Sequence, residues 1–446
     1  MANEKPRKHV EISIEQGQPL LPSSGQAPLK NLSTVGATMA MLRSMLGTGV
    51  LALPKAMKYS GLYLGIGLMF VISIICLHCM RQVVHGAHFI RDRTGKDAID
   101  YAGIMREAIN LGPEWIRGSY KGRTVLDTGY WVKKIVNCTV FVAQLGFCSA
   151  YLLFMTEGVA LILEAFGIDL NKRLIMAGVF FLVQPVCMIR NMKILSIPSG
   201  IANAAYIAAV GILLYFFTTH MNPLEEITKV GDLTDLPLFF GTALYSFEGV
   251  CIVMPLENRM KNPEHFIKPL GVVNVATGLV TLIFTAVGAL GYVAFGDNVH
   301  DAVTLDLPTT PFFKTLNVIL VICVYFTYPV QFHVPMERAE KWISRKMPQK
   351  HHAKLFYLAR AFGVSLTLVI AMLVPHLSLV IALIGAVVCT FLALIYPPII
   401  ELLCSYAKKD LTVGIWIKNV AIICFGIVGA VMGTSVAGGD LLDKVF

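Results

Sequence analysis

Two short glycine-containing segments interrupt otherwise apolar stretches, and they hold the best candidates for binding chemistry in this chain. Gly-Thr-Gly occupies 47–49 inside the apolar stretch 37–55, and Ser-Phe-Glu-Gly occupies 246–249 inside the stretch 236–256. Glycine lets a helical backbone open and lets a ligand approach it closely. Unwound backbone at membrane depth persists only where protein or a watery cavity satisfies its polar groups.

The two breaks offer opposite partial charges to a ligand. Opening the first break frees N–H groups at the start of the following half-helix, where the helix dipole favours an anion such as a carboxylate. Opening the second break leaves carbonyl groups without partners at the end of a half-helix, which suits an ammonium group. Together they predict a zwitterionic ligand, an amino acid. The predicted substrate-binding residues are Leu46, Gly47, Thr48, Gly49, Tyr245, Ser246, Phe247 and Gly249.

Glu248 is the most informative ionisable residue, because a charged carboxyl at membrane depth is costly. It must be protonated, paired or facing water, and we interpret it as the candidate for proton coupling. The alternative is a neutral structural Glu that hydrogen-bonds an adjacent helix. Gln144, Tyr325 and Arg43 are candidates for lining the pocket. Helix packing, the aromatic belt and a cytosolic vestibule are the competing interpretations for these three.

Glycine is frequent in membrane helices and permits close packing, so one Gly motif alone would not indicate a site. Here two motifs fall in corresponding places, in the first and the sixth predicted spans. Paired interruptions of this kind are typical of the substrate site of an inverted-repeat transporter.

The composition is that of a membrane protein. The 446 residues are 56% hydrophobic and only 15% charged, with a mean hydropathy of +0.67, whereas soluble proteins carry about a quarter charged residues. Uncharged runs of about 20 residues, long enough to cross a bilayer as helices, recur along the chain. The uncharged run 361–400 would form one helix about 60 Å long, twice the hydrocarbon thickness. It must therefore be two spans, with the turn at Pro375-His376.

Eleven membrane-spanning helices are predicted. They cover about 33–58, 61–88, 128–157, 172–190, 193–219, 236–258, 268–296, 311–340, 355–375, 377–405 and 412–437. Lys and Arg concentrate on one side, with about ten in 81–134 and about seven in 338–360. This bias predicts a cytosolic N-terminus and an extracytosolic C-terminus.

The expected fold is an all-α polytopic membrane protein, a five-plus-five inverted repeat whose first and sixth helices are broken. The segments are a disordered cytosolic tail over 1–32, a transporter domain over 33–437 and a short extracytosolic tail over 438–446. Repeat one covers 33–219, repeat two covers 236–405, and an extra helix covers 412–437. The loop segment 97–109 is either a short amphipathic helix on the inner membrane surface or a plain solvated loop.

Several other functions are excluded by missing patterns. No His, Asp and Glu cluster has catalytic or metal-ligand spacing, and the chain has no phosphate-binding Gly-x4-Gly-Lys-Ser/Thr motif, so an enzyme is not expected. No repeat supplies the charged or carbonyl rings of an ion channel. The net charge of +9 belongs to cytosolic loops rather than to nucleic-acid binding. We expect no cofactor and no metal, a proton as coupling ion, and a small neutral amino acid and the lipid bilayer as partners.

Seven segments share their order with a known group. They are Leu42 to Pro54 (LRSMLGTGVLALP), Gln144 to Cys148 (QLGFC), Pro237 to Ala243 (PLFFGTA), Ser246 to Gly249 (SFEG), Pro255 to Asn258 (PLEN), Thr304 to Pro308 (TLDLP) and Tyr396 to Pro398 (YPP). Over about 45–400 the chain thereby resembles the amino acid/auxin permease family, and within it the animal proton-assisted amino acid transporters. The resemblance implies eleven helices in a leucine-transporter-like architecture. It also implies transport of small neutral amino acids, often with a proton.

Some positions depart from the pattern of this family. Coupled members resemble each other in a His about seven residues before Gly-Thr-Gly, where this chain has Ala40. They also look to share an outer disulfide, whereas 167–172 has no Cys and Thr310 stands where the second would be expected. Three functions therefore stay open. The chain could be a symporter coupled through Glu248 or an uncoupled facilitator. It could also be an amino acid sensor (a transceptor) that signals to a cytosolic partner at the N-terminal tail. Plasma membrane and endolysosomal membrane (lysosome) are both compatible with the sequence.

Overall fold

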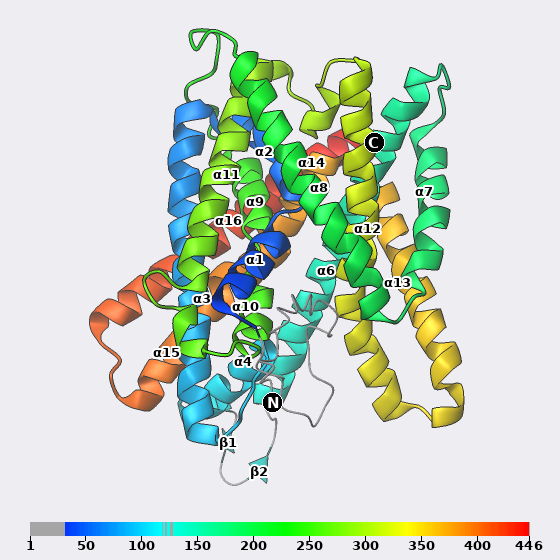
Figure 1. Ribbon diagram of the computed structural model, residues 1–446. Helices are drawn as coiled ribbons and strands as arrows, with labels where there is room; N and C mark the ends of the chain where they lie inside the picture. The colour runs from blue at the N-terminus through cyan, green and yellow to red at the C-terminus, as the bar shows by residue number, and fades with distance from the viewer. Residues whose placement is uncertain (1–31, 118, 121–122, 125–127, 446) are drawn as a thin grey trace, which may run out of the picture.

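The computed structural model describes residues 32–117, 119–120, 123–124 and 128–445, and this part of the chain is almost entirely helical (Figure 1). The α-helices are α1 Thr34–Met45, α2 Thr48–Ser60, α3 Leu62–Thr94, α4 Tyr101–Leu111, α5 Glu114–Arg117, α6 Thr128–Ala165, α7 Lys172–Cys187, α8 Met192–Thr219, α9 Leu236–Ser246, α10 Val250–Glu257, α11 Val272–Phe295, α12 Pro311–Lys346, α13 His352–Leu373, α14 Leu377–Ile384, α15 Tyr396–Lys408 and α16 Val413–Val445. The predicted all-α class is confirmed, and the predicted tail over 1–32 lies, except for Leu32, outside the described residues.

The remaining elements are short. Two π-helical segments, η5 Gly385–Cys389 and η6 Phe391–Ile395, connect α14 to α15. Single 3-10 turns are η1 Pro263–Phe266, η2 Gly296–Asn298, η3 Val303–Leu305 and η4 Gln349–His351. Between α5 and α6, β1 Ser119–Tyr120 pairs antiparallel with β2 Arg123–Thr124.

Nine helices among the described residues are long and apolar enough to cross a membrane, and the bent pair α1 and α2 makes a tenth. The chain is therefore a multi-pass membrane protein. α7 has 16 residues, which make a helix of about 24 Å, shorter than the roughly 30 Å hydrocarbon core. The total of eleven spans and the inverted repeat accordingly stay predictions. The turn predicted at Pro375-His376 is confirmed, because α13 ends at Leu373 and α14 begins at Leu377.

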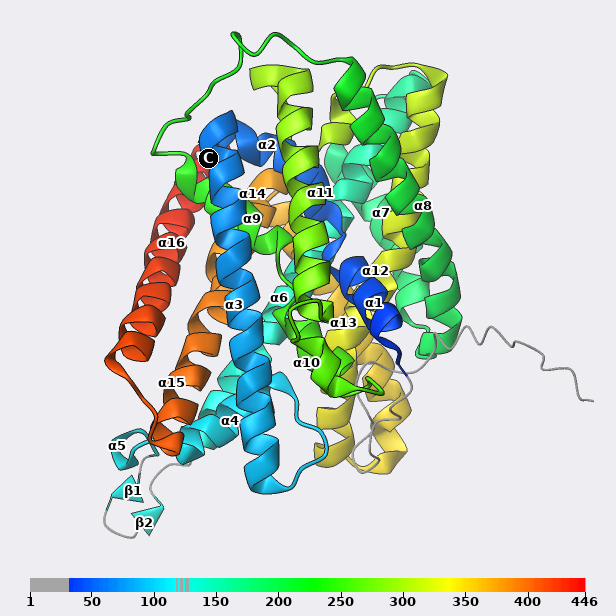
Figure 2. The ribbon, with the colours of Figure 1, turned by 60° about the vertical axis from the view of Figure 1, so that its left-hand side comes forward.

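Most helices run side by side as a bundle, with α16 along its outer edge (Figure 2). In the span formed by α9 and α10, 83% of the most apolar window is buried, against 17% for α16. The second break thus lies in the centre of the bundle, where protein rather than lipid surrounds its backbone.

Both predicted interruptions are present. α1 ends at Met45, Leu46 and Gly47 are extended, and α2 begins at Thr48 with its axis turned by 55°. α9 ends at Ser246, and α10 begins only at Val250.

Two terminal or loop segments differ from expectation. The segment predicted as either a surface helix or a loop over 97–109 forms α4, but its apolar face packs inside the protein, and the Tyr101 hydroxyl donates to the carbonyl of Leu392 at 2.7 Å. An amphipathic face needs an apolar partner, and here α6 and α15 supply it instead of lipid. The predicted tail over 438–446 continues α16 as helix through Val445.

Candidate functional site

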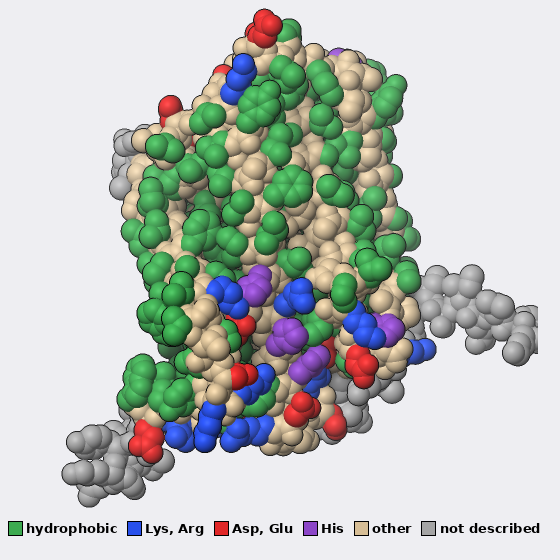
Figure 3. Space-filling model, turned by 90° about the vertical axis from the view of Figure 1, so that its left-hand side faces the viewer, with side chains coloured by type: hydrophobic (Ala, Val, Ile, Leu, Met, Phe, Trp, Pro, Cys, Tyr) green, Lys and Arg blue, Asp and Glu red, His purple; other side chains and the backbone are tan. Residues whose placement is uncertain are grey.

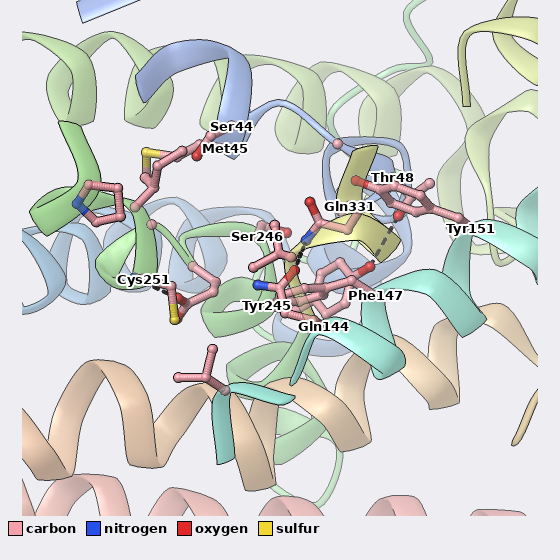
Figure 4. A pocket seen from close by; sticks show the side chains of 18 of the residues that line it. Ser44, Met45, Thr48, Gln144, Phe147, Tyr151, Tyr245, Ser246, Cys251 and Gln331 are labelled. Atoms are coloured by element: carbon pink, nitrogen blue, oxygen red, sulfur yellow. Dashed lines mark hydrogen bonds between the residues drawn. The ribbon is translucent and has the colours of Figure 1, made fainter. Parts of the chain in front are cut away.

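Both breaks line one cavity of about 130 Å³. One water molecule needs about 10–15 Å³ of such space, so the cavity has room for a small solute. Its walls come from the facing ends of α1, α2, α9 and α10 and from one face each of α6 and α12 (Figure 4). The lining residues are Ser44, Met45, Gly47, Thr48, Gly49, Val140, Gln144, Phe147, Tyr151, Tyr245, Ser246, Glu248, Gly249, Cys251, Ile252, Pro255, Gln331, Val334, Glu337 and Arg338.

At the first break, the start of α2 faces the cavity. Gly47 is the N-cap residue of α2 and provides no side-chain hydrogen bond to the helix. The positive end of the helix dipole is therefore available to a ligand in the cavity. The Gly47 carbonyl accepts the Tyr206 hydroxyl of α8 at 2.7 Å and the Val50 N–H at 3.3 Å. The unwound backbone is thus held in place from a neighbouring helix.

We expect Tyr206→Phe to weaken uptake of substrate by about two- to tenfold. The variant keeps the buried ring but removes one hydrogen bond, worth about 0.5–1.5 kcal/mol, from the carbonyl that orders the break. Initial uptake rates in liposomes measure the effect. Tyr215→Phe, whose ring is 74% exposed on the same helix, is the matched control and should leave uptake unchanged. Equal rates for wild type and Tyr206→Phe would contradict a positioning role.

The two breaks touch each other at Gly49. A Cβ atom there would lie 2.7 Å from Ser246 Oγ and 3.1 Å from both Ser246 Cα and Tyr245 Cδ1. Nearby, the Thr48 hydroxyl and the Tyr245 hydroxyl are hydrogen-bonded at 3.2 Å. Only glycine permits this approach, because no side-chain atom fits between the two backbones.

The end of α9 offers fewer free carbonyls than the sequence suggested. The Ser246 hydroxyl donates to the Thr242 carbonyl at 2.9 Å, and the N–H groups of residues 247 and 248 donate to the carbonyls of Ala243 and Tyr245. An ammonium group at this break therefore has to use other acceptors in the cavity.

Glu248 supplies such an acceptor. Its Oε1 accepts the Cys251 N–H at 3.3 Å and so caps the start of α10. Its Oε2 is buried and has no hydrogen-bond partner among the described residues. One carboxyl oxygen thus stabilises the local fold, while the other is open, meaning that it has no hydrogen-bond partner among the described residues. A buried oxygen of this kind requires a proton, a cation or a hydrogen-bond donor from a ligand.

The opposite wall is built from α6 and α12. Gln331 Nε2 donates to Gln144 Oε1 at 2.7 Å, and the Phe147 ring meets the Tyr245 ring edge-on at 4.9 Å (Figure 4). The Tyr151 hydroxyl comes 3.1 Å from the place of a Cβ at Gly47. This wall therefore combines aromatic faces with a polar amide pair.

Several lining residues were not predicted, although one signal for them was present. Val140 lies four residues before the predicted Gln144, and Phe147 and Tyr151 lie three and seven residues after it. This helical spacing puts all of them on one face of α6. Gln331 is an uncharged polar residue in the middle of an apolar helix, which is itself an indication of a functional position.

Eight of the twelve predicted residues line the cavity, and four do not. Leu46 is the extended residue directly after α1, and Phe247 packs its ring against Phe284 of α11 at 5.4 Å. The Tyr325 hydroxyl donates to the carbonyl of Leu182, and Arg43 donates to the hydroxyl of Ser199 at 2.7 Å, both away from the cavity. The eight are Gly47, Thr48, Gly49, Gln144, Tyr245, Ser246, Glu248 and Gly249. Their roles in binding stay predictions.

The cavity extends from the breaks toward one end of the molecule. α2 and α9 contribute only the residues next to the breaks, whereas α10 lines it down to Pro255 and α12 down to Glu337 and Arg338. Glu337 is paired with Lys341 at 2.7 Å, and Arg338 Nη1 is buried without a hydrogen-bond partner in the described part of the chain. The open oxygen of Glu248 and this cation therefore lie along one passage.

Comparison with known proteins identifies relatives over nearly the whole chain. A family model described as transmembrane amino acid transporter protein matches residues 30–437. The Drosophila melanogaster proton-coupled amino acid transporter-like protein pathetic is 30% identical over 410 residues, which are 90% of this chain and 84% of that protein. The Caenorhabditis elegans probable amino acid transporter skat-1 is 25% identical over 413 residues, or 88% and 85% of the two chains.

Two solved structures share the fold at 13% sequence identity. MhsT in complex with L-phenylalanine has a TM-score of 0.51 and covers 93% of this chain and 100% of its own. The inward-facing conformation of Mhp1 has a TM-score of 0.50 and covers 82% of this chain and 80% of its own.

Proposed function

Because this chain belongs to the transmembrane amino acid transporter family, we propose that it moves small neutral amino acids by alternating access, in symport with protons. The family resemblance noted from the sequence is confirmed, and membership makes the protein a transporter rather than an enzyme. The observation that carries the finer proposal is that both helix breaks line the same cavity. A zwitterion spanning that cavity reaches the start of α2 with its carboxylate and the acceptors around the second break with its ammonium group.

The cavity favours a small substrate with an uncharged side chain. Its volume of about 130 Å³ is bounded by Phe147, Tyr151 and Tyr245, and the contact of Gly49 with Ser246 closes it beyond the breaks. These aromatic walls leave an apolar space for the side chain. Of the charged lining residues, Glu248 is placed to meet the ammonium group or a proton, and Glu337 and Arg338 lie at the far end of the passage.

Proton coupling rests on the open oxygen of Glu248. The carboxyl lies inside the cavity, where it alternates between a protonated form and a charged form that pairs with the substrate ammonium. Arg338 lies further along the same passage, where its positive charge can attract anionic groups. No other buried acid lines the cavity among the described residues.

We further propose eleven spans in two inverted five-helix repeats, with the N-terminus in the cytosol. Support comes from α7, which would be the eleventh span after the bent pair, and from the likeness in fold to MhsT. The concentration of Lys and Arg at one end of the molecule agrees with a cytosolic face there (Figure 3). In this orientation the cavity opens inward, and the membrane is either the plasma membrane or an endolysosomal one.

Uptake by the purified protein in liposomes tests this function. We expect saturable uptake of at least one of labelled proline, alanine, glycine and tryptophan, stimulated when the pH on the substrate side is lowered. Protein-free liposomes are the control. Saturable uptake indifferent to the proton gradient would select a facilitator, and saturable binding without uptake would select a sensor. The proposal would be contradicted if the protein neither bound nor took up any amino acid.

A further inference from the structure

One face of α3 changes from apolar to polar and basic along its length. Toward its start the outward residues are apolar, with Tyr63 56% and Ile74 64% exposed. Continuing at helical spacing, the same face carries His78, Arg81 and His85. The spacing of 74, 78, 81 and 85 keeps these side chains on one stripe, so the surface that faces lipid above turns basic below.

The length of the apolar part places the basic residues at the edge of a bilayer. From Leu62 to Arg81 the helix rises about 28 Å at 1.5 Å per residue, close to the roughly 30 Å hydrocarbon thickness. Arg81 thus lies at the depth where lipid phosphates begin, and its long side chain can reach them.

The tips of α15 and α16 add two cations beside this stripe. Lys408 Nζ lies 4.8 Å from the centre of the Phe89 ring of α3, and Lys418 of α16 is bonded to Glu401 at 2.8 Å. Gln82 of α3 also donates to Glu401 at 2.7 Å, which holds the three helices together. We call His78, Arg81, His85, Lys408 and Lys418 the basic patch. Figure 3 shows Lys, Arg and His side chains gathered below the apolar belt on this side.

The basic patch has more positive charge than its own acid neutralises. Glu401 is occupied by Lys418, Gln82 and Asn419. Among the described residues, Arg81 and Lys408 have no hydrogen bond or ion pair, and the Lys408 ammonium lies over the Phe89 ring. Asp410 follows Lys408 and Lys409 in the α15–α16 turn, and Asp92 lies between Arg91 and Arg93 about 16 Å beyond Arg81 along α3, so cations outnumber these two acids. Unpaired cations at headgroup depth attract anionic lipids.

We propose that the basic patch is a binding site for the phosphate headgroup of an anionic phospholipid. The acyl chains would lie along the exposed apolar face of α3 above Arg81, and the phosphate would accept hydrogen bonds from Arg81. Lys408 lies over Phe89, about 12 Å further along α3, and would attract the same headgroup by its charge. The basic patch lies on lipid-facing surface outside the transport cavity, so lipid binding there does not depend on which substrate the protein carries.

The test counts lipid adducts on the full-length protein in detergent by native mass spectrometry. Phosphatidylglycerol and phosphatidylcholine of equal chain length are the probes. We expect wild type to retain phosphatidylglycerol in preference to phosphatidylcholine. Arg81→Gln with Lys408→Gln should weaken phosphatidylglycerol binding about twenty-five-fold, since each cation near a membrane surface contributes about fivefold.

Two control variants make the result decisive. Lys350→Gln with Lys354→Gln removes two exposed cations before and within α13, far from the basic patch, and should leave binding unchanged. Arg81→Lys should restore most of the binding, which shows that charge rather than misfolding causes the loss. Equal retention of both lipids by wild type would overturn the proposal. So would equal losses in the test and control pairs, or unchanged binding in Arg81→Gln with Lys408→Gln.

Discussion

Gly49→Val is expected to abolish transport, lowering the uptake rate by about a hundredfold or more. The first atom of any side chain at this position would lie 2.7 Å from Ser246 Oγ and 3.1 Å from Ser246 Cα. The hydroxyl can rotate away, but the backbone Cα cannot, so α2 must move away from α9. Displacing binding groups by about 1 Å is enough to cost about a hundredfold in rate.

The valine methyl groups add a second obstacle, because Gly49 itself lines the cavity. Overpacking of this kind costs about 1–3 kcal/mol of stability, which a membrane protein of this size tolerates. The initial uptake rate, compared at equal amounts of monodisperse protein, measures the functional loss separately from folding.

Gly278→Val is the matched control, because a Cβ at Gly278 of α11 has no neighbour within 4 Å and valine fits there freely. Gly49→Ala should be less severe than Gly49→Val, because it adds the Cβ atom without the two methyl groups that would enter the cavity. Uptake by Gly49→Val equal to that of wild type would show that the contact between the breaks is not part of the site.

The positions of both breaks were predictable because their cause is local. Glycine and a carboxyl group inside an apolar run are unfavourable in a continuous helix exposed to lipid. This can be recognised from the sequence without any tertiary information. The structure places the interruptions at Leu46 and Gly47 and at Phe247 to Gly249, so the first lies slightly earlier than the predicted 47–49 and the second lies within the predicted 246–249. The turn at Pro375-His376 was predictable for a similar reason, because a single helix there would be twice too long.

The walls contributed by other helices were not predictable from local pattern alone. Which face of α6 or α12 meets the breaks depends on how the helices pack, and that is a property of the whole bundle. Gln144 was identified by its type, but Phe147 and Tyr151 look like ordinary packing residues until the cavity is known. Phe247 shows the converse, since it belongs to the break but its ring packs against Phe284 on the far side.

Glu248→Gln is expected to remove the response of uptake to a proton gradient while leaving the protein folded. A glutamine oxygen can still accept the Cys251 N–H that Glu248 Oε1 now accepts at 3.3 Å, so the start of α10 stays capped. The amide also resembles a permanently protonated carboxyl in shape. The variant keeps an acceptor oxygen for the substrate ammonium but loses the negative charge, so we expect weaker substrate binding. It also cannot take up and release the proton that drives accumulation.

Accumulation at the end of uptake distinguishes these states better than the initial rate does. A gradient of one pH unit supplies about 1.4 kcal/mol per proton, enough to concentrate a symported substrate about tenfold. Wild type should reach that order of accumulation with the acidic side facing the substrate, and Glu248→Gln should stop at equal concentrations. The exposed Glu264→Gln, in η1 outside the cavity, serves as control and should accumulate substrate as wild type does. If Glu248→Gln still concentrated substrate down an imposed proton gradient, the coupling proton would have to travel by a different group, and the buried open oxygen would serve the fold or the substrate alone.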